Sequence, residues 1–375
     1  MSTVTRLLLV MGMMAALGAG LSHAAEKSRA KSAGHLGHNA NTVGIVAGPA
    51  GSASLEMMAD LAAVLDGKDM RILPIAGKNP VQNVTDLLYL KGIDVAVLPT
   101  DVLDYVEANR IHGAVTGRVN YIAKLYGDEV HLIARREIAD VKSLAGRKVD
   151  VGPELSASAV TGEALLKALK VKVEPTNHDF WDALGKLKAG EIDAMVYVAP
   201  RPAEGLTAIS AGDGLKLLPV EIEGDAAERY PPSLLTAADY PGLIEANGEV
   251  STVSVGEVLA VFNWERGGAR YSSVRRFVSR FLDSFDTLVE TSTDRRWKNV
   301  NLAAEVEGWQ RDDEAKAWLS KASAKKSDAT EQGAEELRSA FKRFLETNGE
   351  SQALSQPDQS ELFKRFLNWK EAGGQ

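Results

Sequence analysis

Two short loops rich in glycine and serine contain the residues best suited to bind a ligand. They are Gly48–Ser54 and Gly152–Ser158, and each lies between an apolar run and a segment with helical spacing. A helix that begins in such a loop presents unpaired backbone N–H groups and the positive end of its dipole, which favours an anion. The candidate ligand contacts in these loops are Gly51, Ser52, Ser54, Ser156 and Ser158. For each serine, the alternative role is to cap the helix.

One arginine is the best candidate to hold a carboxylate. Arg201 follows the end of an apolar run and lies between Pro200 and Pro202, which restrict the local backbone. Its guanidinium group presents a planar fork of donors that matches the two oxygens of a carboxylate. The alternative is a solvated loop arginine, or one that forms an ion pair with Glu204.

The remaining candidate contacts lie where predicted elements begin or end. They are Gln82, Asn83, Thr100, Asp101, Tyr126 and Tyr197. The two amides begin a predicted helix and are candidates to touch the ligand. Thr100 and Asp101 end a predicted strand, where a structural cap is the alternative. The two tyrosines lie beside strands, where packing in the core is the alternative.

The sequence lacks most of the residues and motifs on which enzymes depend. It has no cysteine, which excludes thiol catalysis, disulfides and Cys-ligated zinc or iron–sulfur clusters. The phosphate-loop, His-Glu-x-x-His and Gly-x-Ser-x-Gly motifs do not occur, and the glycines of residues 44–51 have the wrong spacing for a dinucleotide fingerprint. The formal net charge of −8 argues against nucleic acid as a partner. We therefore expect a binding protein without a cofactor or metal, not an enzyme.

The elements that must position these residues alternate between strand and helix. Apolar runs at 43–47, 70–75 and 93–98 are predicted strands that alternate with segments at helical spacing. A second series of the same kind begins at Val130. This alternation predicts βαβ units, mainly parallel sheets and two successive α/β lobes. Ligands of such sheets lie outside the carboxyl ends of the strands, where the glycine- and serine-rich loops fall.

Several short stretches of the sequence, taken together and in this order, resemble the motifs of a known family. They are Val43–Ser54, Val81–Val84, Ile93–Asp101, Leu125–Ser158 and Lys188–Ala194. In these stretches the chain resembles the TAXI-type solute-binding receptors of tripartite ATP-independent periplasmic (TRAP) transporters, over roughly residues 41–290. Three departures leave the ligand open: Ser52–Leu55 replace the usual aromatic residues, Pro80 replaces a serine, and Leu155 replaces a glycine.

The resemblance implies a fold and its boundaries. The fold is α/β, of the periplasmic-binding-protein type II, with two lobes around a ligand cleft and a helical C-terminal extension. Lobe 1 is expected to contain residues 41–128 and 221–290, and lobe 2 residues 129–220. The chain is expected to cross between the lobes near Asp128 and Val220.

The resemblance also implies a function. The cleft is expected to bind a small organic anion, either a carboxylate or an amino acid, and the protein to deliver it to the integral-membrane permease of a TRAP transporter. A receptor for an ABC importer is one alternative. The other is an envelope sensory or adaptor protein that a partner recognises through the C-terminal helices.

The N-terminus has the composition of an export signal. Arg6 is followed by the apolar core Leu7–Leu17 and then by small residues up to Ala24, as in a cleavable signal peptide. The core is shorter than the roughly 20 apolar residues that span a bilayer, although an uncleaved anchor remains the alternative. We expect residues 1–24 to be the signal peptide, residues 25–40 a flexible leader, and the periplasm to be the location.

The C-terminal extension, residues 291–375, differs in composition from the rest. It contains two amphipathic segments, whose apolar residues are Leu337, Phe341, Phe344 and Leu345 in the first and Leu362, Phe363, Phe366 and Leu367 in the second. Packing onto lobe 1 or the hinge is the simpler interpretation. A docking surface for a permease, a sensor or a second copy is the alternative.

Overall fold

The computed structural model describes residues 41–325 and the single residues Leu337, Ser339, Phe341, Lys364 and Phe366. The predicted signal peptide and leader, residues 1–40, lie outside the described residues. The chain divides into one compact unit that ends at Ala315 and a second that begins at Lys316. Within the described part of the chain, no helix is both long enough and apolar enough to cross a lipid bilayer.

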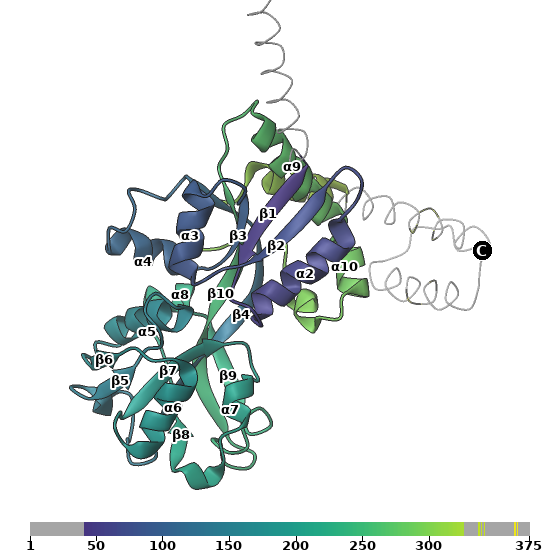
Figure 1. The fold of residues 1–375 in the computed structure, drawn as a ribbon. Coiled ribbons are helices and arrows are strands. Elements are labelled where there is room, and N and C mark those ends of the chain that lie inside the picture. Colours follow the sequence, from purple (N-terminus) through teal and green to yellow (C-terminus); the bar gives the residue numbers. More distant parts are fainter. Residues whose placement is uncertain are drawn as a thin grey trace, which may run out of the picture. The chain divides into compact units, whose positions relative to one another are not determined.

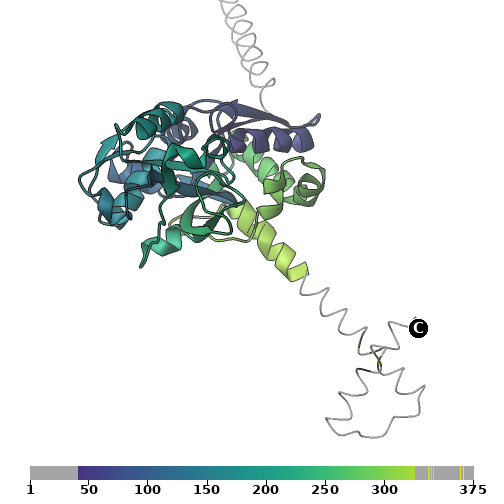
Figure 2. The same cartoon turned by 90° about the horizontal axis from the view of Figure 1, so that it is seen from below.

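Lobe 1 is a sheet with helices on both sides (Figure 1). Its strand order is β2-β1-β3-β10-β4, with β1, β2 and β3 parallel and β10 antiparallel to β3. Helices α9 and α10 lie beside α2 (Figures 1 and 2). The elements that belong to this lobe alone are β1 (Thr42–Ala47), α2 (Ala53–Leu65), β2 (Arg71–Ala76), α3 (Pro80–Tyr89), β3 (Val95–Pro99), α4 (Val102–Ala108), α9 (Ala269–Asp283), α10 (Phe285–Thr291) and the 3-10 helix η3 (Arg295–Asn299).

Lobe 2 continues the same sheet in the order β4-β7-β5-β6. Strand β8 pairs with β4, and β9 pairs with β10. The elements are η1 (Lys142–Leu144), β5 (Lys148–Asp150), α5 (Ala157–Ala168), β6 (Glu174–Thr176), α6 (Phe180–Ala189), β7 (Ala194–Ala199), α7 (Glu204–Thr207), η2 (Ala211–Asp213), β8 (Leu215–Leu217), α8 (Ala226–Arg229) and β9 (Pro232–Thr236). The prediction of two α/β lobes is confirmed.

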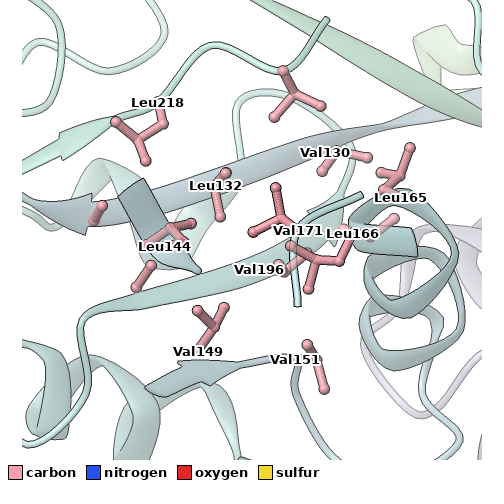
Figure 3. Close-up of a cluster of buried hydrophobic side chains, with 14 of the residues drawn as sticks. Val130, Leu132, Leu144, Val149, Val151, Leu165, Leu166, Val171, Val196 and Leu218 are labelled. Carbon is pink, nitrogen blue, oxygen red and sulfur yellow. The ribbon is translucent and has the colours of Figure 1, made fainter. Parts of the chain in front are cut away.

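The core of lobe 2 explains why its strands read as apolar runs in the sequence. Figure 3 shows valines and leucines of β4, β5 and β7 packed against Leu165 and Leu166 of α5. Strands covered on both faces bury nearly every side chain, so their sequences lack the alternation of a half-exposed strand. In β7, for example, five of the six residues Ala194–Ala199 are buried.

Two long strands connect the lobes. Strand β4 (Val119–Arg135) has 17 residues and β10 (Glu249–Phe262) has 14, and they pair antiparallel along much of their length. One end of each strand lies in lobe 1, where β10 pairs with β3. The other end lies in lobe 2, where β4 pairs with β7 and β10 pairs with β9. These two strands therefore form the hinge region.

We place the two crossings at Asp128–Glu129 and Val255–Gly256. The sequence analysis expected the crossings near Asp128 and Val220, and the second of our two positions lies well after Val220. Tyr230, Val253 and Val255 belong to the same core cluster as the strands of lobe 2, and Leu235 and Tyr240 belong to its second cluster. Residues 221–255 therefore pack with lobe 2. The cause is the length of β10, which begins in one lobe and ends in the other.

The first part of the predicted C-terminal extension packs onto lobe 1. Trp297 is completely buried, and Val306 belongs to the core cluster of lobe 1. Trp309 donates a hydrogen bond from Nε1 to the carbonyl of Thr100 at 2.7 Å. Buried Arg311 donates to the carbonyls of Leu302, Ala303 and Ala304. Up to Ala315, the extension is thus part of the lobe.

Residues beyond Ala315 form the second unit. The chain is helical from residue 313 to residue 325. Phe341 and Phe366 belong to the two amphipathic segments predicted from the sequence, and their rings are 5.2 Å apart between centroids. The other apolar residues of those segments, apart from Leu337, lie outside the described residues.

Candidate functional site

A cavity of about 920 Å³ lies between the two lobes, and we call it the cleft. Lobe 1 lines it with the loops before α2 and α3, and lobe 2 lines it with the loops before α5 and α6. The hinge strands contribute Tyr126, Asp128 and Glu257. Parallel strands end at this edge of each lobe, so the cleft has the position expected for a ligand site.

Four helices of ten or more residues begin at the cleft, two from each lobe. Ser52 caps α2 by accepting from the N–H of Leu55 at 3.4 Å, and Ser156 caps α5 by accepting from Ala159 at 3.2 Å. Asn79 caps α3 by accepting from Gln82 at 2.8 Å. The fourth helix, α6, begins after Asp179 without a side-chain cap. Each N-terminus adds a positive partial charge to the cleft.

The two loops predicted to bind ligand have the same backbone construction. In each, the N-cap serine donates its N–H to a proline carbonyl at 3.0 Å, Pro49 in the first loop and Pro153 in the second. The residue before each N-cap has a positive φ, +81° at Gly51 and +62° at Leu155. This turn requires a left-handed residue at its third position, which glycine adopts without strain and leucine does not.

The second serine of each loop is also used inside the protein. The hydroxyl of Ser54 accepts from the N–H of Gly48 at 2.9 Å, and that of Ser158 accepts from the N–H of Val198 at 3.0 Å. All four predicted serines therefore line the cleft while they hold a loop or a helix end. A hydroxyl that accepts one hydrogen bond still has a proton to donate.

Several predicted contacts line the cleft. They are Gly51, Ser52, Ser54, Asn83, Tyr126, Ser156, Ser158 and Tyr197. Asn83 is 3% exposed, and its Nδ2 donates to the carbonyl of Ala47 at 2.8 Å. Its Oδ1 has no hydrogen-bond partner within the described part of the chain. An amide fixed at one end and free at the other is suited to receive a donor.

Gln82 and Thr100 do not line the cleft. Gln82 lies in the first turn of α3, on its exposed side, and donates from Nε2 to Asp86 at 2.8 Å. The N–H of Thr100 donates to the carbonyl of Gly256 at 2.8 Å. Both residues begin or end an element as predicted, but their contacts are within lobe 1 and the hinge.

Arg201, predicted to hold a ligand carboxylate, has carboxylate partners from the protein itself. Its Nε lies 3.3 Å from Glu129, and its Nη1 lies 3.7 Å from Asp239. Nη1 also donates to the carbonyl of Leu234 at 2.6 Å. Glu129 and Asp128 are consecutive in β4 and leave it on opposite faces. Arg201 thus lies on the face away from Asp128, beside a second cavity of about 770 Å³.

Asp101 connects the two lobes instead of lining the cleft. Its carboxylate accepts hydrogen bonds from Thr161 of α5 at 2.8 Å and from Tyr230 at 2.9 Å. Both donors belong to lobe 2, whereas Asp101 precedes α4 of lobe 1. Burial raises the pKa of Asp101 to about 6, although these two hydrogen bonds oppose the shift. A buried carboxyl with two donors from the opposite lobe holds the lobes together on one side of the cleft.

The sequence analysis missed the charged residues that determine the electrostatics of the cleft. Arg296, in η3, lies over the ring of Tyr126, 5.8 Å from its centroid, and forms ion pairs with Asp294 and Glu56. His178 lies 2.6 Å from Asp150. Within the described residues, exposed Lys78 has no ion pair. No sequence signal joined Arg296 to residues some 240 positions earlier.

Aromatic side chains form the wall of the cleft on the side of lobe 2. The ring of Phe180 lies 4.6 Å from that of Tyr197 and 5.0 Å from that of Trp181, between centroids. Trp181 is 64% exposed although it lines the cavity. Such a wall offers both an apolar surface and π faces to a ligand. Among the described residues, no group of three or more side chains is arranged to hold a metal ion.

Comparison with known proteins identifies one matching family. The model of the NMT1-like family matches residues 45–267. No curated protein matches the sequence.

Solved structures with low similarity include three binding proteins. A TctC solute-binding protein from Polaromonas is 16% identical, with a TM-score of 0.40, over 66% of this chain and 88% of that one. The periplasmic aliphatic sulphonate-binding protein SsuA from Escherichia coli is 18% identical, with a TM-score of 0.40, over 67% and 74%. The amino acid ABC transporter substrate-binding protein AbpA from Streptococcus pneumoniae is 14% identical, with a TM-score of 0.37, over 69% and 95%.

Proposed function

This chain belongs to the NMT1-like family, and on that premise we propose that it is a solute-binding protein, which captures a small organic anion in the cleft and delivers it to a membrane permease. The anion is a carboxylate or an amino acid. The observation that supports this best is the convergence of the N-termini of four helices of ten or more residues on one cavity of about 920 Å³. Function by binding, without catalysis, agrees with the lack of enzyme motifs.

The helix N-termini favour a negative group because their first N–H groups have no partner inside the helix. Backbone donors from α2 and α5 face the ligand from opposite lobes. Lys78, next to the N-cap of α3, adds a full positive charge at the edge of the cleft. Contacts from both lobes favour the arrangement in which the lobes enclose the ligand, and that arrangement is what a permease would recognise.

The TRAP-type permease and the periplasmic location are proposed from the sequence alone. The motifs between residues 41 and 290 support the first, and the apolar core Leu7–Leu17 supports the second. A receptor for an ABC importer is compatible with the same fold. Residues 316–375 form a separate unit and are the candidate segment for a protein partner.

A thermal-shift screen of the purified chain tests the binding function. The panel contains C4-dicarboxylates, 2-oxo acids, amino acids and aromatic acids. A ligand at about 100 times its Kd adds about 2.7 kcal/mol to the free energy of unfolding, which is a visible increase in Tm. If no member of the panel or of a wider set of organic anions raises Tm, the proposed function is wrong.

A charge placed at a helix N-terminus tests where the anion binds. Ala157 is the first residue of α5 and lines the cleft. Ala157→Glu places a carboxylate where the ligand's negative group is expected, so binding should weaken by at least about 100-fold, while an acidic residue in the first turn stabilises the helix. Ala269→Glu makes the same change at the start of α9, away from the cleft, and should bind normally. Equal affinity of the two variants would contradict the proposed position.

A further inference from the structure

The cleft has an inner wall that is acidic, opposite in character to the helix N-termini. Tyr126 and Asp128 leave β4 on one face, and Val255 of β10 pairs with Asp128. Glu257 follows Val255 by two residues, next to a bulge, and therefore leaves the hinge sheet on the same face. Asp128 is 8% exposed and Glu257 is 6% exposed, and both line the cleft.

Within the described part of the chain, neither oxygen of Asp128 has a hydrogen-bond or ion-pair partner, and its Oδ1 is completely buried. Two other buried carboxylates of the described residues have partners: Asp94 forms a bidentate pair with Arg270, and Asp150 accepts hydrogen bonds from Gly152 and Thr176. Arg296 lies near Asp128, but its guanidinium group forms ion pairs with Asp294 and Glu56. A buried carboxylate without a partner is costly, so its retention indicates that something else satisfies it.

The charged groups around this wall work against ionisation. Burial raises the pKa of Asp128, with a further increase from Glu129 and a decrease from Arg296. Burial also raises the pKa of Glu257, with further increases from Asp128 and Asp101. Tyr126 and Tyr197 face the same space, and burial raises the pKa of each hydroxyl, with a further increase from the charge of Asp128. Two carboxyl groups in such a site keep at least one proton between them when no cation is bound.

We propose that Asp128 and Glu257 form a subsite for the protonated amine of the ligand, so that the ligand is an amino acid whose carboxylate faces the helix N-termini. The assignment rests on the proposed function and names the ligand class within it. Binding of the ammonium group ionises both carboxyl groups, and the proton that they shared passes to the solvent. The faces of Phe180 and Tyr197 add favourable surfaces for a cation.

Matched pairs of ligands test the subsite without any mutation. Each amino acid is compared with the 2-oxo acid and the 2-hydroxy acid of the same carbon skeleton by isothermal titration calorimetry. The amino acid should bind roughly 100-fold more tightly, because a ligand without the ammonium group leaves the buried carboxyl groups unpaired. Titrations at pH 7 in two buffers with different ionisation enthalpies should show release of a proton with the amino acid and none with the oxo acid.

Charge-neutral variants test the two residues. Asp128→Asn and Glu257→Gln keep the shape of the wall and remove its negative charge. Each should weaken binding of the amino acid by roughly 100-fold, abolish proton release, and leave the affinity for the oxo acid unchanged or higher. Glu290→Gln is the matched control, since Glu290 is an exposed carboxylate of α10 outside the cleft, and it should change affinity by less than about 3-fold.

The outcomes separate the two proposals. Preference for the amine, proton release and loss of both in Asp128→Asn support the subsite. A simple acid that binds as tightly as its amino counterpart, with no proton release, overturns the subsite and leaves the receptor function in place. If either variant fails to fold, the ligand pairs and the proton release of the unmodified protein decide the question. Absence of binding by every small molecule overturns both.

Discussion

The two loops that face each other across the cleft differ at one position, although their turns and caps are the same. Gly48–Ser54 has Gly51 at φ +81°, with open space where a Cβ would lie. Gly152–Ser158 has Leu155 at φ +62°, and the leucine side chain packs against the core of the opposite lobe. A leucine there costs about 1–2 kcal/mol of backbone strain, which the packing offsets. At this position the first loop has no side chain that could pack against the opposite lobe, whereas the second loop is attached to lobe 1 through Leu155.

The helix that follows the second loop is attached in the same way. Val160 of α5 belongs to the core cluster of lobe 1, and Thr161 donates to Asp101. Helix α2 has no equivalent contact with the core clusters of lobe 2 among the described residues. One side of the cleft therefore contains fixed contacts between the lobes. A motion that separates the lobes on this side of the cleft must therefore break these contacts.

The largest expected effect is the pH dependence of stability that Asp101 contributes. Its pKa rises from 3.8 to about 6 on folding, so the folded state binds this proton more tightly. The resulting stabilisation is complete below about pH 3.8 and is lost as the pH rises through about 6, and it amounts to about 3 kcal/mol. The difference in unfolding free energy between the unmodified protein and Asp101→Asn should change by that amount between pH 3.5 and pH 7.5.

Only that difference isolates Asp101, because His131 has the opposite effect. Burial lowers the pKa of His131 to about 4, which stabilises the folded state above about pH 6.5 and is lost as the pH falls through 4. Denaturant titrations of both proteins at five pH values measure the difference. A difference that does not vary with pH would show that Asp101 has its ordinary pKa.

The next effect concerns the donor from α5. Thr161→Val keeps the shape of the side chain and removes one of the two hydrogen bonds to Asp101. The unfolding free energy at pH 8 should fall by about 2 kcal/mol, because a buried ionised acceptor loses a donor. Thr291→Val is the control, since exposed Thr291 bonds only to a carbonyl of its own helix, and it should change stability by less than about 0.5 kcal/mol.

The smallest effect tests the strain at Leu155 directly. Leu155→Gly and Leu155→Ala both lose the packing, but only glycine also removes the strain of a positive φ. The glycine variant should be more stable than the alanine variant by about 1 kcal/mol, the reverse of the usual order. At Glu154, in the same turn without a positive φ, the alanine variant should be at least as stable as the glycine variant. Urea denaturation measures the unfolding free energy of all four variants. If Leu155→Ala is at least as stable as Leu155→Gly, the backbone at Leu155 is not strained.

Much of the site was predictable because its determinants are local. A serine before an apolar helix is a cap or a ligand contact whatever surrounds it, and Ser52 and Ser156 are both caps that line the cleft. The charged residues that were predicted as contacts but do not line the cleft have distant partners. Arg201 was assigned to a ligand because its Glu129 partner lies 72 positions away. Asp101 was assigned to the cleft because Thr161 and Tyr230 are invisible as neighbours in the sequence.

The sequence by itself determined the elements, the two α/β lobes, the capped loops and the absence of most enzyme motifs, because each follows from composition or from spacings of a few residues. Only the tertiary structure decided where the chain crosses between the lobes and which charges reach the cleft. Alternation along β4 requires Asp128 and Glu129 to leave on opposite faces, but the strand is buried on both, so the pattern does not say which face borders the cleft. The packing of β10 and η3 against that strand supplies the answer.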